Sequence, residues 1–360
     1  MKKFSGIVLG LALMTSLNCD MTALAGTMYV NASNLNMRKE ASMTGQVVQL
    51  LPRGTEVEQV QDLGEWSQVT VNGKSGYVAT RYLAASKSVG SQQAAAPTAG
   101  QTHVTSANVA KSWDVSLNMN APYASFTKIN SGKAIFYQSS SANRKEKTIC
   151  VNAGHGTKGG SSVKTLCHPD GTPKVTSGTT AAGATTAVAV SSGMTFNDGT
   201  PESKVTLAMA KILKEKLLAE GYDVLMIREG DDVQLDNIAR SVLANTNADC
   251  HIALHWDSTT KDKGCFFMSV PNNATYRAME PVASHWESHN RLGTCLIDGL
   301  RAEGNKIFSN GSMEMDLTQT SYSTVPSVDI ELGDKASSYS DAALKKLADG
   351  LVSGINQFYR

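Results

Sequence analysis

Four side chains in the C-terminal part of the chain have the types and positions that metal-assisted hydrolysis needs. His155 follows a short apolar run, His255 ends another, and Glu331 lies near the end of a third, while Glu202 lies in the first turn of an expected helix. Two histidines and one carboxylate are a typical catalytic zinc set, because three protein ligands leave one position open for water. The remaining carboxylate can accept the proton of that water and later return it to the leaving group.

The spacing of these residues forms no compact motif. The two histidines and the glutamate between them lie 47 and 53 positions apart, so only the fold can bring them together. Other histidines are weaker candidates. His251 is expected in the core, and His285 and His289 lie four apart but do not spell the His-Glu-x-x-His metal motif.

Alternating apolar runs and helical periodicities from Thr148 onward are expected to position the four side chains. Strands joined by helices predict an α/β domain with a mostly parallel sheet flanked by helices. In such sheets functional groups collect at the carboxyl ends of the strands. The expected strands are 148–153, 222–227, 250–255 and 328–332. The expected helices are one that opens at 200–202 and ends at Gly221, and those at 235–244, 288–301 and 342–358.

The first 25 residues are expected to be a signal peptide. Two lysines form a charged start, residues 7–17 are an apolar run too short to span a bilayer, and residues 23–25 are a small-residue cleavage site. A lipid anchor on Cys19 is the less favoured alternative, because the residue before it is a poor match for a lipobox. The mature protein is therefore expected to be secreted and to have no transmembrane span.

The remaining cysteines do not indicate a metal or redox motif. An odd number in an exported chain leaves at least one thiol free, and none has the C-x-x-C spacing. We expect buried structural thiols. These cysteines are Cys150, Cys167, Cys250, Cys265 and Cys295.

Residues 26–84 are expected to form a small all-β barrel. Short β-rich runs alternate with turn signals, and the Asn72-Gly73 pair between alternating residues is a strong hairpin signal. This module resembles the bacterial SH3 domain, a resemblance that implies tethering to a cell-wall ligand. The residues that carry it are Leu35-Asn36-Met37-Arg38, Leu51-Pro52-Arg53-Gly54-Thr55, Gly64-Glu65-Trp66, Asn72-Gly73-Lys74-Ser75-Gly76-Tyr77-Val78 and Tyr82-Leu83.

Residues 85–147 are expected to be a linker and a lead-in segment. The part up to residue 112 has few large apolar groups and cannot bury enough surface to fold. The part from Trp113 contains several aromatic residues that could pack on the next domain, and the sequence leaves this open. The next domain is expected to span residues 148–360.

Residues 148–360 resemble the zinc-dependent N-acetylmuramoyl-L-alanine amidases of the Amidase_3 type. The motifs that carry the resemblance are Gly154-His155-Gly156, Glu202 followed by Leu207-Ala208, Gly221-Tyr222-Asp223-Val224, Ala248-Asp249 before His255, and Pro326-Ser327-Val328-Asp329-Ile330-Glu331-Leu332-Gly333. The resemblance implies a zinc ion held by His155, Glu202 and His255, with Glu331 as the general acid/base. It also implies hydrolysis of the amide between N-acetylmuramic acid and L-alanine in peptidoglycan.

Several features depart from that family or remain open. Asn152 stands where the family commonly has an Asp that could orient a ligand. Trp256 could stack on sugar, shape the groove or be ordinary packing. Segment 157–199 could be a lid or substrate-selecting flap, or a floppy insertion. Arg228 and Arg240 are expected to be structural ion-pair partners rather than substrate clamps.

Charge narrows the possible partners. Lys and Arg total 33 against 32 Asp and Glu, which argues against binding to nucleic acid. We therefore expect a multidomain, secreted, cell-wall-associated hydrolase whose SH3-like module tethers it to peptidoglycan. The alternatives are a non-catalytic wall-binding protein with a degenerate amidase domain, or a zinc peptidase of the stem peptide. The sequence does not indicate an oligomeric state.

Overall fold

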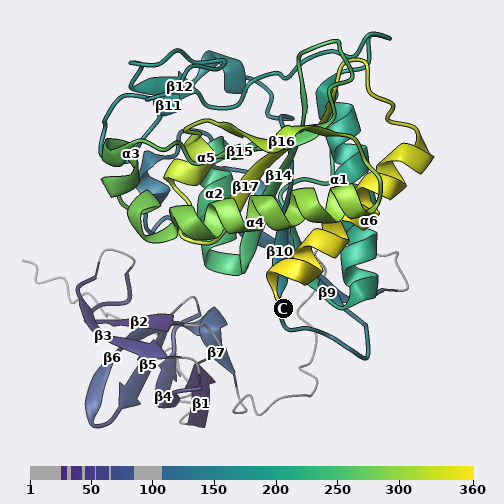
Figure 1. The fold of residues 1–360 in the computed structure, drawn as a ribbon. Coiled ribbons are helices and arrows are strands. Elements are labelled where there is room, and N and C mark those ends of the chain that lie inside the picture. The colour runs from purple at the N-terminus through teal and green to yellow at the C-terminus, as the bar shows by residue number, and fades with distance from the viewer. Residues whose placement is uncertain (1–25, 31–33, 43–44, 53, 65, 85–107) are drawn as a thin grey trace, which may run out of the picture. The chain divides into compact units, whose positions relative to one another are not determined.

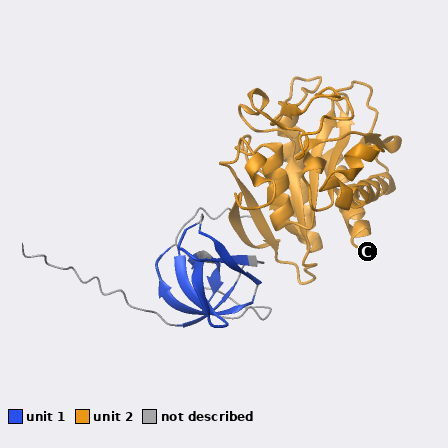
Figure 2. Cartoon of the chain, turned by 90° about the vertical axis from the view of Figure 1, so that its left-hand side faces the viewer, with its two compact units in different colours: residues 1–98 blue, residues 99–360 orange. Residues whose placement is uncertain are grey.

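The chain divides into two compact units, unit 1 (residues 1–98) and unit 2 (residues 99–360), which are described separately (Figures 1 and 2). The expected signal peptide, with its alternative anchor at Cys19, and residues 85–107 of the expected linker lie outside the described residues. The computed structural model describes residues 26–30, 34–42, 45–52, 54–64, 66–84 and 108–360.

Unit 1 confirms the expected all-β module. Its strands form one sheet in the order β3-β2-β6-β5-β4-β1-β7, and every described pairing is antiparallel. The predicted hairpin joins β5 to β6, where Asn72 and Gly73 have φ values of 50° and 77°. The elements are β1 (Gly26–Val30), β2 (Asn34–Arg38), β3 (Val47–Pro52), β4 (Glu56–Asp62), β5 (Trp66–Val71), β6 (Lys74–Ala79), η1 (Thr80–Tyr82) and β7 (Leu83–Ala84).

Unit 2 is built on a mixed sheet in the order β16-β15-β17-β14-β10-β13-β9-β8. The expected parallel arrangement is found for the central strands β17, β14, β10 and β13. The sheet as a whole is mixed, because β15 pairs antiparallel with β17 and the β8–β9 pair joins β13 antiparallel, while β16 at the outer edge pairs parallel with β15. The strands are β8 (Val109–Ser116), β9 (Lys133–Ser139), β10 (Thr148–Ala153), β13 (Asp223–Met226), β14 (Cys250–Asp257), β15 (Cys265–Ser269), β16 (Ile307–Glu314) and β17 (Ser327–Asp334).

The lead-in segment forms the antiparallel edge on one side of the sheet. Strands β8 and β9, joined by residues 117–132, pair antiparallel from Val109 opposite Ser139 to Ser116 opposite Lys133. Trp113 of β8 stacks on Phe136 of β9, with ring centroids 4.4 Å apart. The aromatic residues of this segment thus pack within the sheet of unit 2, which the sequence had left open.

Helices cover both faces of the sheet (Figure 1). Ile149 and Val151 of β10 face the core beneath α1, α4 and α6, whereas Cys150 between them faces α2. This alternation is the period of two that a strand imposes on its side chains. The remaining elements are η2 (Ala124–Phe126), η3 (Gly160–Ser162), β11 (Lys164–Leu166), β12 (Thr186–Val188), α1 (Glu202–Glu220), α2 (Asn237–Asn247), α3 (Ala274–Ala278), α4 (Val282–Ala302), α5 (Thr318–Ser321) and α6 (Asp341–Phe358).

The five cysteines of unit 2 are buried and free of disulfides, as expected for structural thiols. Among the described helices, none combines the length and the apolar character that crossing a membrane requires.

Candidate metal centre

The central parallel strands and the start of α1 bring three of the four candidate side chains together. His155 follows the end of β10, His255 lies near the end of the neighbouring strand β14, and Glu202 is the first residue of α1. Because β10 and β14 are parallel, their carboxyl ends meet at the same edge of the sheet. His155 itself has a φ of 61°, in the left-handed region that few non-glycine residues adopt.

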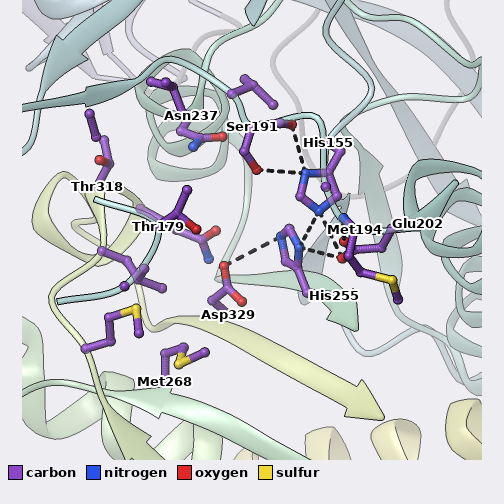
Figure 3. Close-up of a pocket in the computed structure, with 18 of the residues that line it drawn as sticks. His155, Thr179, Ser191, Met194, Glu202, Asn237, His255, Met268, Thr318 and Asp329 are labelled. Carbon is purple, nitrogen blue, oxygen red and sulfur yellow. Dashed lines mark hydrogen bonds and ion pairs between the residues drawn. The ribbon is translucent and has the colours of Figure 1, made fainter. Parts of the chain in front are cut away.

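The donor atoms of His155, Glu202 and His255, here called the triad, form a tight triangle (Figure 3). Glu202 Oε1 lies 2.9 Å from His155 Nε2 and 3.1 Å from His255 Nδ1. The two imidazole nitrogens lie 3.1 Å apart. His155 and Glu202 are buried, with exposed fractions of 7% and 2%, so water does not solvate this cluster freely.

The proton positions within the triad indicate a metal site. His155 Nδ1 lies 2.9 Å from the carbonyl oxygen of Ser191, which can only accept, so this nitrogen carries the proton. The lone pair of His155 Nε2 therefore faces a carboxylate oxygen and a second imidazole nitrogen. Zinc bonds of about 2.0–2.1 Å place tetrahedral ligand atoms about 3.3 Å apart, close to the observed triangle. The residues present fit a zinc ion.

Glu331 lies beside the triad on β17. It is the register partner of His255 in the β14–β17 pair, and it lines the same cavity. Its Oε2 atom is buried without a hydrogen-bond partner among the described residues. Burial raises the pKa of this carboxyl well above its ordinary value. A buried, unpaired carboxyl group next to a cluster of metal-ligand type is suited to exchanging protons with a substrate.

A glycine next to the first histidine permits the close approach of the two strands. A Cβ atom at Gly154 would lie 2.2 Å from Cε1 of the His255 ring. Any other residue at this position would therefore displace a member of the triad. Glycine at position 154 is thus required by the packing against His255, in addition to being part of the Gly154-His155-Gly156 motif described above.

Two buried arginines hold the loop that carries His155. Arg228 donates hydrogen bonds to the backbone oxygens of Ala153 and Gly154, at 3.1 and 2.9 Å. Arg240 donates to the backbone oxygen of His155 at 2.7 Å, and burial lowers its pKa to about 9. Their structural role was expected, but the expected ion pairs are wrong, since no described carboxylate lies within ion-pair distance of either arginine. Both arginines instead donate hydrogen bonds to backbone carbonyl oxygens.

Two further open questions are decided by contacts. The side chain of Asn152 accepts a hydrogen bond from Arg240 and contacts His251, so it does not orient a member of the triad. Trp256 is only 2% exposed and packs against Phe196, so its ring is not open for stacking on a sugar. Its backbone nitrogen donates to Glu202 Oε1 at 3.0 Å, so its position still matters to the triad.

The other histidines that the structure describes do not join a metal-type cluster. His251 is fully buried in the core, as expected. His289 accepts a hydrogen bond from the backbone nitrogen of Ser327, and His285 contacts the backbone oxygen of Pro281. Within the described part of the chain, the triad is the only group of three such side chains that could share a metal ion.

The insert, residues 157–199, builds one wall of the site, and the sequence did not predict its direct contacts with the triad. Besides Ser191, it provides the backbone nitrogen of Met194, which donates to Glu202 Oε2 at 2.8 Å. It also lines a cavity of about 670 Å³ that opens beside the triad. The insert contacts the triad through the carbonyl oxygen of Ser191 and the backbone nitrogen of Met194. Because these are backbone atoms, no motif in the sequence predicts the two contacts.

A buried carboxylate anchors the insert to the rest of unit 2. Asp316, which lies between β16 and α5, contacts Lys174 Nζ at 3.0 Å and His168 Nε2 at 3.1 Å. It also accepts hydrogen bonds from the backbone nitrogens of Val175 and Thr176, at 2.7 and 3.0 Å. The insert is therefore a pinned structural element rather than a floppy insertion.

Replacing Asp316 with asparagine is expected to destabilise unit 2 by about 3 kcal/mol, because Lys174 would keep a buried charge without a counter-charge. Urea denaturation followed by circular dichroism measures the loss. The matched control is Asp298→Asn, which removes an exposed pair with Arg301 and should cost less than about 1 kcal/mol. Equal losses in the two variants would show that Asp316 is no anchor.

Comparison with known proteins finds a family match for each unit. Residues 33–84 match the bacterial SH3 domain. No curated protein gives a significant match. Similar solved structures include the N-acetylmuramyl-L-alanine amidase Ami1 of Mycobacterium abscessus, with 20% identity over 60% of this chain and 99% of that chain and a TM-score of 0.48. Ami1 of Mycobacterium smegmatis has 21% identity over 60% of this chain and 98% of that chain, also with a TM-score of 0.48.

Another similar structure is an N-acetylmuramoyl-L-alanine amidase from Clostridium difficile 630, with 17% identity over 59% of this chain and 96% of that chain and a TM-score of 0.42. The comparison with protein families gives a second match, in unit 2. Residues 149–357 match the family described as N-acetylmuramoyl-L-alanine amidase, and this range covers more than half of the chain. The chain therefore belongs to the N-acetylmuramoyl-L-alanine amidase family.

Proposed function

We propose that the protein cleaves the amide bond between N-acetylmuramic acid and L-alanine in peptidoglycan, with zinc held by His155, Glu202 and His255 and with Glu331 as the general acid/base. The observation that carries this proposal is the triangle of three facing donor atoms, one with an assigned lone pair, next to a buried unpaired carboxyl group. Family membership supports the choice of bond.

The proposed reaction replaces the C–N bond of the scissile amide by a C–O bond to water. When bound, zinc would polarise that carbonyl and acidify the attacking water. Glu331 takes a proton from the water as the new C–O bond forms, and it then delivers the proton to the alanine nitrogen as the C–N bond breaks. The Ser191 carbonyl holds the proton on His155 Nδ1, so that its other nitrogen stays an acceptor. The products are a free lactyl carboxylate and a stem peptide with a free amino terminus.

The two units would divide the work between tethering and cleavage. We propose that residues 26–84 bind a cell-wall ligand and that residues 148–360 contain the catalytic machinery. Export directed by residues 1–25 would deliver the enzyme to the wall. The match of unit 1 to the bacterial SH3 domain supports this division.

Mass spectrometry of digested peptidoglycan tests the proposed bond. We expect new amino groups on L-alanine and intact glycan strands. New amino groups elsewhere in the stem peptide would identify a zinc peptidase instead. Binding to peptidoglycan without any new end group would support the non-catalytic alternative.

Removing divalent metal is expected to abolish hydrolysis, and one equivalent of zinc should restore it. Zinc should also raise the melting temperature of the metal-free protein, because the ion binds only the folded triad strongly. Calorimetry and the peptidoglycan assay measure the two effects. Magnesium is the control, since it prefers oxygen ligands in octahedral geometry and should restore neither property. Full activity of a verified metal-free sample would refute the zinc role.

A further inference from the structure

Asp329 lies on the opposite side of the His255 ring from the other two members of the triad. Its Oδ2 atom is 3.6 Å from His255 Nε2, whereas His255 Nδ1 faces Glu202 and His155 (Figure 3). Strands β14 and β17 are parallel, with Ala253 opposite Asp329 and His255 opposite Glu331. Residues two apart on a strand share a face, so both carboxylates of β17 point towards the cavity.

The two nitrogens of the His255 ring have different surroundings. A neutral imidazole carries one proton, on either Nδ1 or Nε2. Nδ1 must be free of a proton to act as a ligand, so the proton then lies on Nε2. That proton points to the side of Asp329, where a carboxylate can attract it. The placement of Asp329 thus favours the form of His255 that presents a lone pair to the triad.

Asp329 is not an ordinary surface charge. Its side chain is only 16% exposed, and His255 is the only basic side chain within 4.0 Å of its carboxylate among the described residues. The other Asp of this cavity, Asp257, is neutralised by an ion pair with Lys263. The carboxylate of Asp329 is the third one in this region, beside those of Glu202 and Glu331, and it adds like-charge repulsion. Its closeness to the His255 N–H offsets that repulsion.

We infer that Asp329 is a positioning residue that fixes the orientation and the proton of His255 and thereby strengthens metal binding. The inference rests on the proposed function, because it requires the triad to hold a metal ion. The corresponding arrangement at the first histidine uses the Ser191 carbonyl in place of a carboxylate. An oxygen atom therefore lies behind each imidazole, 2.9 Å from His155 Nδ1 at Ser191 and 3.6 Å from His255 Nε2 at Asp329. Carboxylate partners of this kind orient metal-bound histidines and increase their basicity.

Zinc affinity, measured by competition with a chromogenic chelator on the full chain, tests this inference. Asp329→Asn keeps the shape and one acceptor oxygen but loses the charge, and we expect zinc to bind about 10-fold more weakly. Asp329→Leu removes the acceptor as well and should weaken binding towards 100-fold. In cobalt-substituted protein, the visible absorption bands should also shift in both variants, because the basicity of His255 changes.

The matched control is Asp257→Asn, which removes the same charge from the same cavity without touching the triad and should change zinc affinity less than about twofold. Circular dichroism verifies the fold of each metal-free variant, and the nearly isosteric Asp329→Asn decides if Asp329→Leu does not fold. Wild-type zinc affinity and an unshifted cobalt spectrum in Asp329→Asn would overturn the inference while leaving the proposed function intact. Absence of zinc binding by the wild-type protein would overturn the metal site itself, and this inference with it.

Discussion

Replacing Glu331 with glutamine is expected to lower kcat on peptidoglycan by about 10²- to 10⁴-fold, the usual contribution of a general acid/base. The amide of glutamine has nearly the same shape as the carboxyl group but cannot accept and return a proton at neutral pH. Glu331 is outside the triad, so the variant should still bind zinc with unchanged stoichiometry. Release of stem peptide, quantified by mass spectrometry alongside metal analysis, measures both properties.

One observation and one control variant make this test specific. Glu331 Oε2 has no hydrogen-bond partner among the described residues, so the substitution breaks no described bond of that atom. Glu287→Gln on the exposed face of α4 is the control and should keep at least half of the wild-type activity. A Glu331→Gln enzyme with parental activity would exclude Glu331 as the proton carrier.

Replacing Gly193 with alanine is expected to lower activity by about 100-fold and to weaken zinc binding. A Cβ atom at this position would lie 2.7 Å from Cδ2 of His155, 2.8 Å from its Nε2 and 2.9 Å from Glu202 Oε2. These distances are shorter than van der Waals contact, so two members of the triad must move. Displacements of about 1 Å at a reacting centre can cost about 100-fold in rate. Steady-state kinetics and chelator competition measure the two losses.

The insert offers a close control for the strain of the glycine backbone. Gly193 has a φ of 81° and Gly183 has a φ of 86°, but a Cβ atom at Gly183 would meet nothing within 4 Å. Gly183→Ala should therefore cost about 1–2 kcal/mol of stability through its backbone conformation alone and leave zinc affinity unchanged. If both variants lose zinc affinity equally, strain in the insert and not contact with the triad is the cause.

The interior of unit 2 was predictable because its local signals agree. Apolar runs marked the central strands β10, β13, β14 and β17, and helical periodicity closed by Gly221 marked α1. The sheet edges were not predictable. Strand order depends on which segments meet in space, and the sequence does not reveal that β15 inserts beside β17 in the antiparallel sense.

The candidate site shows the same division. His155, Glu202 and His255 were singled out by residue type, by position at strand and helix ends and by resemblance, and the structure brings their donor atoms together. Their roles remain a prediction. Ser191 and Gly193 escaped notice because they contact the triad through a carbonyl oxygen and through the absence of a side chain. Such features have no signature of residue type.

By itself, the sequence determined which side chains of the proposed chemistry exist and the strand and helix ends at which they lie, because apolar periodicity and residue type are local properties. Only the tertiary structure decided which atoms of these side chains face one another. That outcome depends on the parallel register of β14 and β17 and on the anchoring of the insert at Asp316. A shift of one residue in such a register would turn Asp329 and Glu331 to the other face of the sheet. Contacts between segments so far apart in the chain are decided by the packing of the whole unit.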